Sequence, residues 1–277
     1  MNDLLRELAP ISDEAWGEIE REAKQALIST LGARRVVDFS GPHGWEHSSL
    51  NIGRVEPAQA QLQDGVQTRR RIVQPLVELR APFELQRAEL ENVARGAEDP
   101  DLDAVREAAV KLALAEDKAV FHGYPAGGIK GIAESAADAA LTIPEGYEDY
   151  PAVVAEALDR LRRSGVNGPY GIVLGLRCYT GLNKTMTRGG GFPVIENIRR
   201  IVNGEIVYAP AVDGTVVLSQ RGGDFELCVG QDVSIGYLGH TPTTVTLYLQ
   251  ESMTFRPLSP EAAVPLVYAE KGRGRKK

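Results

Sequence analysis

The sequence predicts a mixed α+β fold, in which helices and strands occupy different parts of the chain. Five stretches with helix-like spacing of apolar residues lie before residue 203, whereas most of the chain after residue 204 has the alternation or short apolar runs of strands. A regular exchange of strand and helix, which would predict a doubly wound sheet, is absent. With 277 residues, 43% of them hydrophobic, the chain is long enough for one large domain or two modest ones.

The first helix is expected over residues 13–31. Ser12 can cap its N-terminus, and Gly32 ends it. Its apolar face consists of Trp16, Ile19, Ala23, Ala26, Leu27 and Leu31. Residues 34–39 (RRVVDF) are expected as a short strand, and residues 41–45 as a loop because they contain two glycines and a proline.

Residues 51–78 predict two extended arms around the turn Asp64-Gly65. The arms are polar, with three successive arginines at 69–71, and an isolated hairpin of this kind has little to stabilise it in water. Two interpretations remain open from the residues alone. The hairpin either reaches over a neighbouring copy of the chain or folds back on its own domain.

Three further helices and a buried strand follow the hairpin. The helices are expected over residues 86–96, from Asp101 or Asp103 to about Phe121, and over residues 151–163; each is followed by or ends at a glycine. Residues 170–176 form a continuous apolar run, which is typical of a strand buried on both faces.

The last third of the chain is expected to be mostly strand. After a helix at 194–202 and a turn at Asn203-Gly204, strands are expected at 204–210, 214–220, 224–230, 232–238 and 243–255. In the last strand the apolar residues Val245, Leu247, Leu249, Met253 and Phe255 alternate with polar ones, so one face should be buried. Glu251 interrupts this pattern, which favours an ion pair or a strand edge over catalysis.

The glycine-rich stretches do not match a nucleotide-binding loop. Residues 187–197 (TRGGGFPVIEN) resemble a phosphate loop, but Phe192 and Pro193 follow the glycines where a lysine and a hydroxyl would be needed. Residues 127–132 (GGIKGI) also lack the required spacing. Nucleotide binding is therefore not expected.

No group of residues has the spacing of a catalytic or metal site. His43 and His47 lie in a glycine-rich loop, His122 ends a helix, and His240 is expected in a turn. The two cysteines, Cys178 and Cys228, form no CxxC motif and are expected as buried free thiols. The adjacent carboxylates Glu116 and Asp117 are expected on a helix surface, facing different directions. We therefore expect no catalytic residue, no metal and no cofactor.

The charge pattern argues against nucleic acid as the main partner. The net charge is −7, and the final KGRGRKK contributes five positive charges, so the remainder carries −7 − 5 = −12. The basic tail is either a contact with nucleic acid or membrane or a solvated terminus. No apolar run is long enough to cross a membrane, and no secretory signal is present, so a cytoplasmic location is expected.

An ordered series of segments resembles the encapsulin shell proteins of the linocin type. The segments include LAPISDEAWGEIEREAK, GRVEPAQ, VELRAPFELQRAELENVARG, AEDKAVFHGY, GIKGI, VNGPYGIVL, QRGGDFELCVGQDVSIGY and TVTLYLQESMTF. They span residues 1–268. The resemblance implies the fold of the Hong Kong 97 phage major capsid protein and a self-assembling icosahedral shell, most often of sixty subunits, that encloses a peroxidase or ferritin-like cargo enzyme.

The resemblance also implies a division of the chain. It assigns residues 1–45 to an N-terminal helix and the first P-domain strand, 46–80 to the extended E-loop and 81–143 to the P-domain with its spine helix. Residues 144–212 would form the A-domain, 213–268 the P-domain and adjoining strands, and 269–277 a basic tail.

Two sets of site residues follow from the same resemblance. The C-terminal targeting peptide of the cargo would bind Leu27, Leu31, Arg34, Asp38, Asp232 and Ile235, so Leu31→Asp or Arg34→Glu should leave shells intact but empty. The loop lining a fivefold pore would contain Lys184, Thr187, Arg188, Gly189, Gly190 and Gly191, where five copies of Arg188 favour anions and bulky replacements of the glycines should slow cargo turnover.

Two other classes of protein remain as alternatives. A phage or prophage capsid protein shares the fold and would enclose nucleic acid. A protease-like enzyme is disfavoured because no nucleophile with a matching base can be found.

Overall fold

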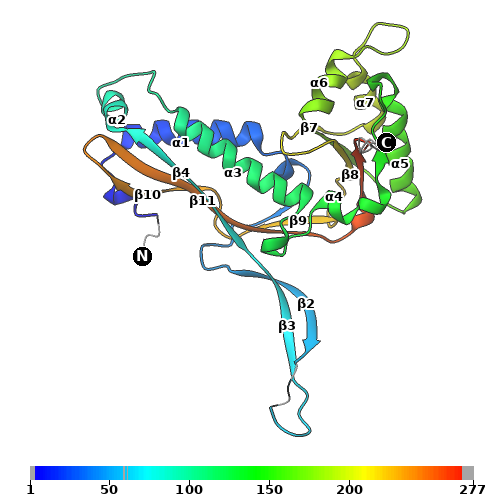
Figure 1. The fold of residues 1–277 in the computed structure, drawn as a ribbon, viewed down its shortest axis with the longest axis horizontal. Coiled ribbons are helices and arrows are strands. Elements are labelled where there is room, and N and C mark those ends of the chain that lie inside the picture. The colour runs from blue at the N-terminus through cyan, green and yellow to red at the C-terminus, as the bar shows by residue number, and fades with distance from the viewer. Residues whose placement is uncertain (1–3, 59, 61, 270–277) are drawn as a thin grey trace, which may run out of the picture.

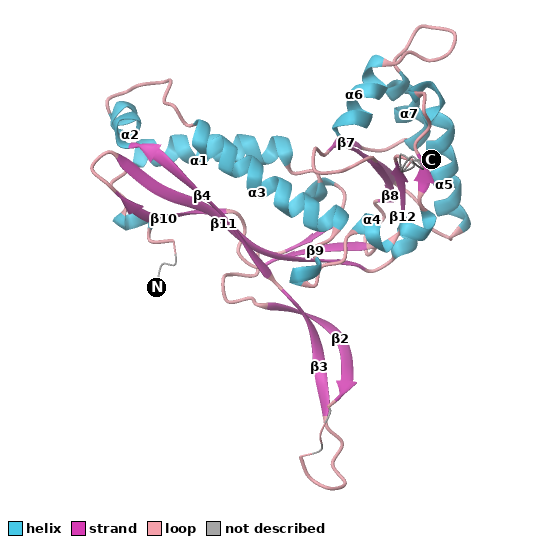
Figure 2. Ribbon diagram, in the orientation of Figure 1, coloured by secondary structure: helices cyan, strands magenta, loops and turns pink. Residues whose placement is uncertain are grey.

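The computed structural model describes residues 4–58, 60 and 62–269. It contains two bodies, each built on a five-stranded sheet, and a two-stranded arm that projects away from both (Figure 1). Helices lie against both sheets, whereas the arm has no helix beside it (Figure 2). The mixed α+β class is as expected. The basic tail, residues 271–277, lies outside the described residues.

The first body packs two long helices against the longest strand. Its helices are α1 (Asp13–Thr30), α2 (Arg87–Ala94) and α3 (Asp103–His122), and its strands are β1 (Asp38–Ser40), β4 (Val77–Gln86), β9 (Phe225–Val229), β10 (Ser234–His240) and β11 (Thr244–Pro257). Strand β11 pairs antiparallel with β4, with β10 through its first half and with β9 at its end. Helix α3 packs on β4 and β11, and α1 packs against α3.

The second body has the sheet order β5-β12-β8-β6-β7. These strands are β5 (Leu141–Thr142), β6 (Tyr170–Leu174), β7 (Ile206–Tyr208), β8 (Thr215–Ser219) and β12 (Ala263–Val267), and the helices are α4 (Ile132–Ser135), α5 (Tyr150–Arg163), α6 (Leu176–Lys184) and α7 (Val194–Val202). Short 3-10 turns occur at Arg6–Leu8, Ala33–Arg35, Pro125–Gly127, Ala137–Ala139, Tyr147–Asp149 and Pro260–Ala262. Within residues 213–268, β8 and β12 belong to this sheet, whereas β9, β10 and β11 belong to the first.

The arm consists of β2 (Ser49–Pro57) and β3 (Arg69–Pro75), with Asp64-Gly65 at its tip. It extends into solvent instead of folding back on its own chain, as Figure 1 shows, and only its base is tied down, through the amide of Gln74 and the carbonyl of Gly128 at 2.7 Å. Several of its apolar side chains are exposed, Leu62 by 90% and Val55 by 51%. Of the two interpretations left open by the sequence, the folded-back excursion is therefore wrong.

The helix predictions at the chain's strongest periodic segments are confirmed, and their ends agree to within a few residues. Ser12 Oγ accepts a hydrogen bond from the backbone of Ala15 at 3.3 Å, as expected for an N-cap. Helix α6 was not predicted, because the apolar run 170–176 suggests a longer strand. The chain instead turns at Gly175, where a Cβ would lie 2.1 Å from the carbonyl oxygen of Val212.

Several strand predictions need correction. The expected strand at 34–39 is a 3-10 turn followed by β1, because the Asp117 carboxylate accepts from the N–H groups of Gly32 and Ala33 at 2.9 Å each and holds the turn. Strands β4 and β12 were missed, although Val77, Leu79, Ala81, Phe83 and Leu85 alternate with other residues along β4. His240, expected in a turn, is the last residue of β10.

Strand β11 is buried on both faces from Leu247 to Phe255 instead of on one. The second face is polar but covered. The Arg80 guanidinium lies 4.3 Å from the Tyr248 ring and donates to the Gln250 side chain at 2.6 Å. Alternation of apolar residues cannot reveal a polar face that is buried in this way.

Candidate functional site

A groove of about 630 Å³ opens between α1 and the start of β10. Five of the six residues predicted to bind a cargo peptide line it: Leu27, Leu31, Arg34, Asp232 and Ile235. The structure therefore brings together side chains that are up to 208 positions apart in the sequence, from Leu27 to Ile235.

One wall of the groove is apolar and open to solvent. Leu27 and Leu31 are half-buried near the end of α1, and Ile28 beside them is 68% exposed. Ile235 and Leu249 face them from the sheet. Ile28 was missed by the sequence analysis because it lies off the buried face of α1. An exposed aliphatic side chain in a groove is a surface on which an apolar ligand can be buried.

Arg34 forms the polar end of the groove and contacts three carboxylates. Its Nε and Nη2 atoms donate to Glu116 at 2.9 and 2.6 Å, Nη2 also donates to Glu251 at 2.9 Å, and Nη1 donates to Asp232 at 2.8 Å. The Glu116 and Glu251 side chains are essentially inaccessible, whereas Asp232 is 43% exposed. Arg34 thus links carboxylates from different parts of the fold and also lines the groove.

The expectation that Glu116 and Asp117 lie on a helix surface is wrong, because both residues are fully buried. They do face different directions, Glu116 towards Arg34 and Asp117 towards the backbone of Gly32 and Ala33. Burial raises the pKa of Asp117 to about 7, although these two N–H groups act in the opposite direction. A sequence signal existed, since Glu116 follows Leu112 and Ala113 at helical spacing on the buried face of α3.

Glu251 forms the ion pair that its position in β11 suggested, but it shares Arg34 with Glu116. Burial and then the neighbouring Glu116 carboxylate raise the pKa of Glu251 well above its usual value. Two buried carboxylates on one guanidinium are best satisfied when one of them keeps its proton.

The raised pKa of Glu251 has a testable consequence for stability. A raised pKa in the folded state stabilises the fold below pH 4.5, and this stabilisation is lost as the pH rises through the folded-state pKa. We expect Glu251→Gln, which cannot titrate, to lose less stability than the wild type as the pH rises from 4.5 towards the folded-state pKa, by up to about 1.4 kcal/mol per pH unit. The measurement is the thermal unfolding midpoint of both proteins at each pH. Parallel curves would show that Glu251 is ionised throughout.

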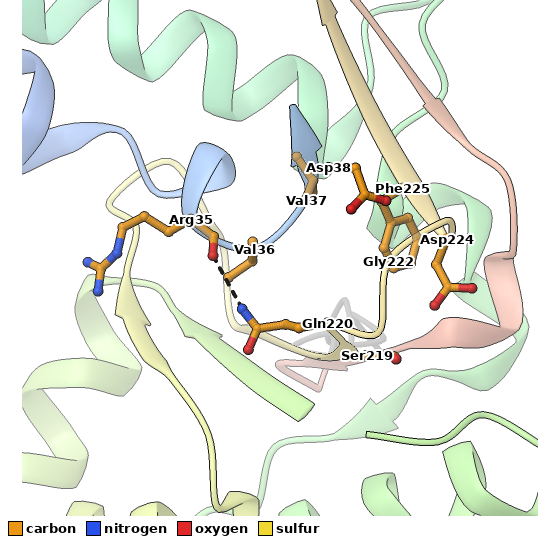
Figure 3. A pocket seen from close by; sticks show the side chains of 9 residues that line it. All are labelled: Arg35, Val36, Val37, Asp38, Ser219, Gln220, Gly222, Asp224 and Phe225. Atoms are coloured by element: carbon orange, nitrogen blue, oxygen red, sulfur yellow. Dashed lines mark hydrogen bonds between the residues drawn. The ribbon is translucent and has the colours of Figure 1, made fainter. Parts of the chain in front are cut away.

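Asp38 does not reach the groove. It lines a smaller pocket of about 150 Å³ between β1 and the turn before β9, with Gln220, Gly222 and Asp224 (Figure 3). Its carboxylate accepts from the N–H of Gly223 at 2.6 Å, and the Gln220 amide donates to the carbonyl of Arg35 at 3.2 Å nearby. Asp38 therefore fixes a turn and does not line the groove with the other five predicted residues.

The segment before α1 forms one end of the groove and was not predicted. Leu4 and Arg6 line it. Arg6 pairs with Glu20 at 2.5 Å and lies 4.2 Å from the Trp16 ring, while the carbonyl of Leu4 accepts from the N–H of Tyr237 at 2.8 Å. These contacts connect the N-terminal segment to both walls.

The glycine-rich loop joins α6 to α7 at the far end of the second body (Figure 1). Its base is closed by the N–H of Thr187 donating to the carbonyl of Phe192 at 3.0 Å. Gly189, Gly190 and Gly191 all have positive φ, at 100°, 79° and 115°, a conformation that favours glycine. Arg188 pairs with Asp149 at 2.7 Å, and Lys184 is the last residue of α6. The loop is exposed, and no phosphate site is built around it.

The remaining candidate residues form no chemical site within the described part of the chain. Cys178 and Cys228 are buried free thiols, as expected. No cluster of three or more metal-ligating side chains occurs among residues 4–58, 60 and 62–269. Over the same residues, no helix is both long enough and apolar enough to cross a membrane.

Known structures share this fold. A virus-like particle protein from Pyrococcus furiosus superposes with a TM-score of 0.65 at 19% identity, covering 91% of this chain and 99% of that one. The capsid protein of Myoviridae phage XM1 superposes with a TM-score of 0.56 at 10% identity, covering 86% and 92%. The expected Hong Kong 97-like capsid fold is therefore confirmed.

Sequence comparison identifies the family more specifically than the fold does. Residues 1–254 match the Linocin_M18 family, described as "Encapsulating protein for peroxidase". A type 1 encapsulin shell protein from Rhodospirillum rubrum is 56% identical over 271 residues, covering 96% of each chain. With this match over nearly its whole length, the chain belongs to the Linocin_M18 family and is a type 1 encapsulin shell protein, a subunit of an encapsulin nanocompartment.

Proposed function

We propose that sixty copies of this chain close into an icosahedral shell in the cytoplasm, and that the groove between α1 and β10 holds the C-terminal targeting peptide of a cargo enzyme. The observation that carries this proposal is the exposed aliphatic wall of Leu27, Ile28 and Leu31 facing Ile235 across an open groove. The family description favours a peroxidase as cargo, and a ferritin-like protein is the alternative. As a shell protein the chain is structural, not catalytic.

The arm supports assembly. An exposed two-stranded ribbon with bare apolar side chains and free edges is stable only against another surface. A neighbouring subunit supplies that surface in a closed shell, and repeated heterologous contacts of one kind can close into a particle. Helical or filamentous assembly would use the same arm without closure.

Electron microscopy of the purified protein, combined with mass spectrometry of the proteins that co-purify, tests the proposal directly. We expect closed particles of sixty subunits that contain a single enzyme with a C-terminal extension. Nuclease-protected nucleic acid in place of protein inside the particles would favour the phage capsid alternative.

The loop with Arg188 is proposed to line the fivefold pore, with five copies of Arg188 and Lys184 around it. Bulky replacements of Gly189–Gly191 would test this poorly, because the positive φ values would strain the loop as well as narrow the opening. Changing the charge of Arg188 tests the pore without straining the glycines. Its pair with Asp149 is exposed, with 72% and 51% of the two side chains accessible, so losing it should cost at most about 1 kcal/mol.

We expect Arg188→Glu to leave assembly unchanged and to slow the turnover of anionic substrates by an enclosed peroxidase several-fold, while neutral peroxide enters at the same rate. The reason is that a ring of five carboxylates repels anions at the opening. The measurement is turnover by loaded shells relative to the free enzyme. Arg163→Glu is a matched control, since Arg163 forms a similarly exposed pair with Asp159. Unchanged turnover of anionic substrates by Arg188→Glu shells would exclude this loop as the selective opening.

A further inference from the structure

Strand β10 is an edge strand of its sheet. Within the described residues it pairs antiparallel with β11, from Ser234 opposite Gln250 to His240 opposite Val245, and with no other strand. Its first residues, Ser234 and Ile235, line the groove. The groove is therefore bounded by a sheet edge as well as by apolar side chains.

At one residue of this edge, Tyr237, the main chain points away from β11. The N–H of Tyr237 donates to the carbonyl of Leu4, so Tyr237 directs its main-chain groups away from β11. These directions alternate along a strand, and the register of β10 is regular up to Tyr237, with its irregularity between Tyr237 and Gly239. Ile235, two residues earlier, must therefore direct its N–H and C=O to the same side.

The main-chain N–H and C=O of Ile235 have no partner among the described residues outside β11. The neighbouring N–H of Val233 is already capped by the Asp232 carboxylate at 2.8 Å. One residue of an incoming strand opposite Ile235 can exchange both hydrogen bonds with it, as in an antiparallel ladder.

We propose that the cargo peptide binds this groove as an added β-strand, with its main chain paired to Ile235 on the same edge where Leu4 pairs with Tyr237. This inference rests on the proposed function of the groove as the cargo site. The chain itself provides the precedent, because its own Leu4 already occupies the next position along the edge.

Strand addition defines the chemistry of the partner. An extended peptide places every second side chain on the same side, about 6.6 Å apart. Alternate aliphatic residues would therefore contact Leu27 and Leu31, with polar residues between them. A helical peptide, whose apolar residues recur every three or four positions, would leave the main chain of Ile235 unpaired.

Proline at position 235 tests the pairing. It removes the N–H that faces the groove without removing a bond to β11, because edge strands tolerate proline where the N–H points outward. We expect Ile235→Pro shells to assemble and to carry at least tenfold less cargo. Leu238→Pro is the control, since Leu238 lies at the irregularity of β10, is 52% exposed and lies outside the groove. It should load normally.

Amide hydrogen exchange on wild-type shells gives an independent measurement should the proline variant fail to fold. Shells expressed alone are compared with shells carrying the enzyme that co-purifies. The Ile235 amide should exchange at least tenfold more slowly in loaded shells, whereas the Gly236 amide, directed at β11, should be protected in both. Equal exchange at Ile235 in the two samples would overturn strand addition.

The outcomes separate this inference from the proposed function. If Leu31→Asp empties the shells while Ile235 is unaffected by cargo, the groove remains the docking site and the peptide binds through side chains alone. If Leu31→Asp shells load normally, the docking site itself is wrong.

Discussion

Replacing Leu31 with aspartate is expected to give shells that assemble normally but contain about a hundredfold less bound cargo peptide. Leu31 is half-buried at the end of α1 and lines the groove, so its carboxylate replacement stays hydrated in the empty shell. A bound peptide would remove that water. The lost apolar contact is worth about 1.5–3 kcal/mol, and dehydration of the charge adds to it. The measurement is the ratio of cargo to shell protein in purified particles.

Leu8→Asp is the matched control for this prediction. Leu8 is 60% exposed, lies in the turn before α1 and does not line the groove. The same change of charge at this position should leave loading unaltered. Leu31→Asp particles with a normal cargo content would contradict the assignment of the groove.

The strongly periodic helices could be predicted because neighbouring residues alone determine them. The groove residues could be predicted because they follow the family pattern. Ser12 and the apolar stripe define α1 by neighbouring residues alone. The glycine-ended helices α2, α3 and α5 follow from the same kind of signal. Family resemblance then placed Leu27, Leu31, Asp232 and Ile235 together, although no spacing rule connects α1 to β10.

The charged cluster could not be predicted, because its cause is tertiary. Helical spacing places Glu116 on the buried face of α3, and Glu251 interrupts an apolar strand; only the folded chain shows that both meet Arg34. Asp117 is a similar case, since it caps a turn that lies 84 positions away at Ala33. Asp38 is near Arg34 in sequence, but its carboxylate accepts from the N–H of Gly223 in the turn before β9, so it lies outside the groove.

The cluster changes the expectation for Arg34, for which the sequence analysis predicted intact but empty shells. Arg34→Ala is expected to destabilise the subunit by about 3–5 kcal/mol and to lower the yield of assembled shells sharply. It would leave the inaccessible carboxylates of Glu116 and Glu251 without a cation. Arg34→Glu should be worse, since it adds a third carboxylate. The measurement is the yield and thermal unfolding midpoint of the shells.

The neighbouring Arg35 and a compensated variant complete this test. Arg35 pairs with Glu205, and its side chain is 48% exposed, so Arg35→Ala should cost at most about 1 kcal/mol. Replacing all three ionisable side chains, as Arg34→Met with Glu116→Gln and Glu251→Gln, should recover most of the stability lost in Arg34→Ala, because the main cost in Arg34→Ala is a buried charge without a partner. Stable, empty Arg34→Ala shells would show instead that Arg34 acts mainly on the peptide. Recovery of stability in the triple variant would show that the main role of Arg34 is to stabilise the subunit and that binding of the cargo peptide is its lesser role.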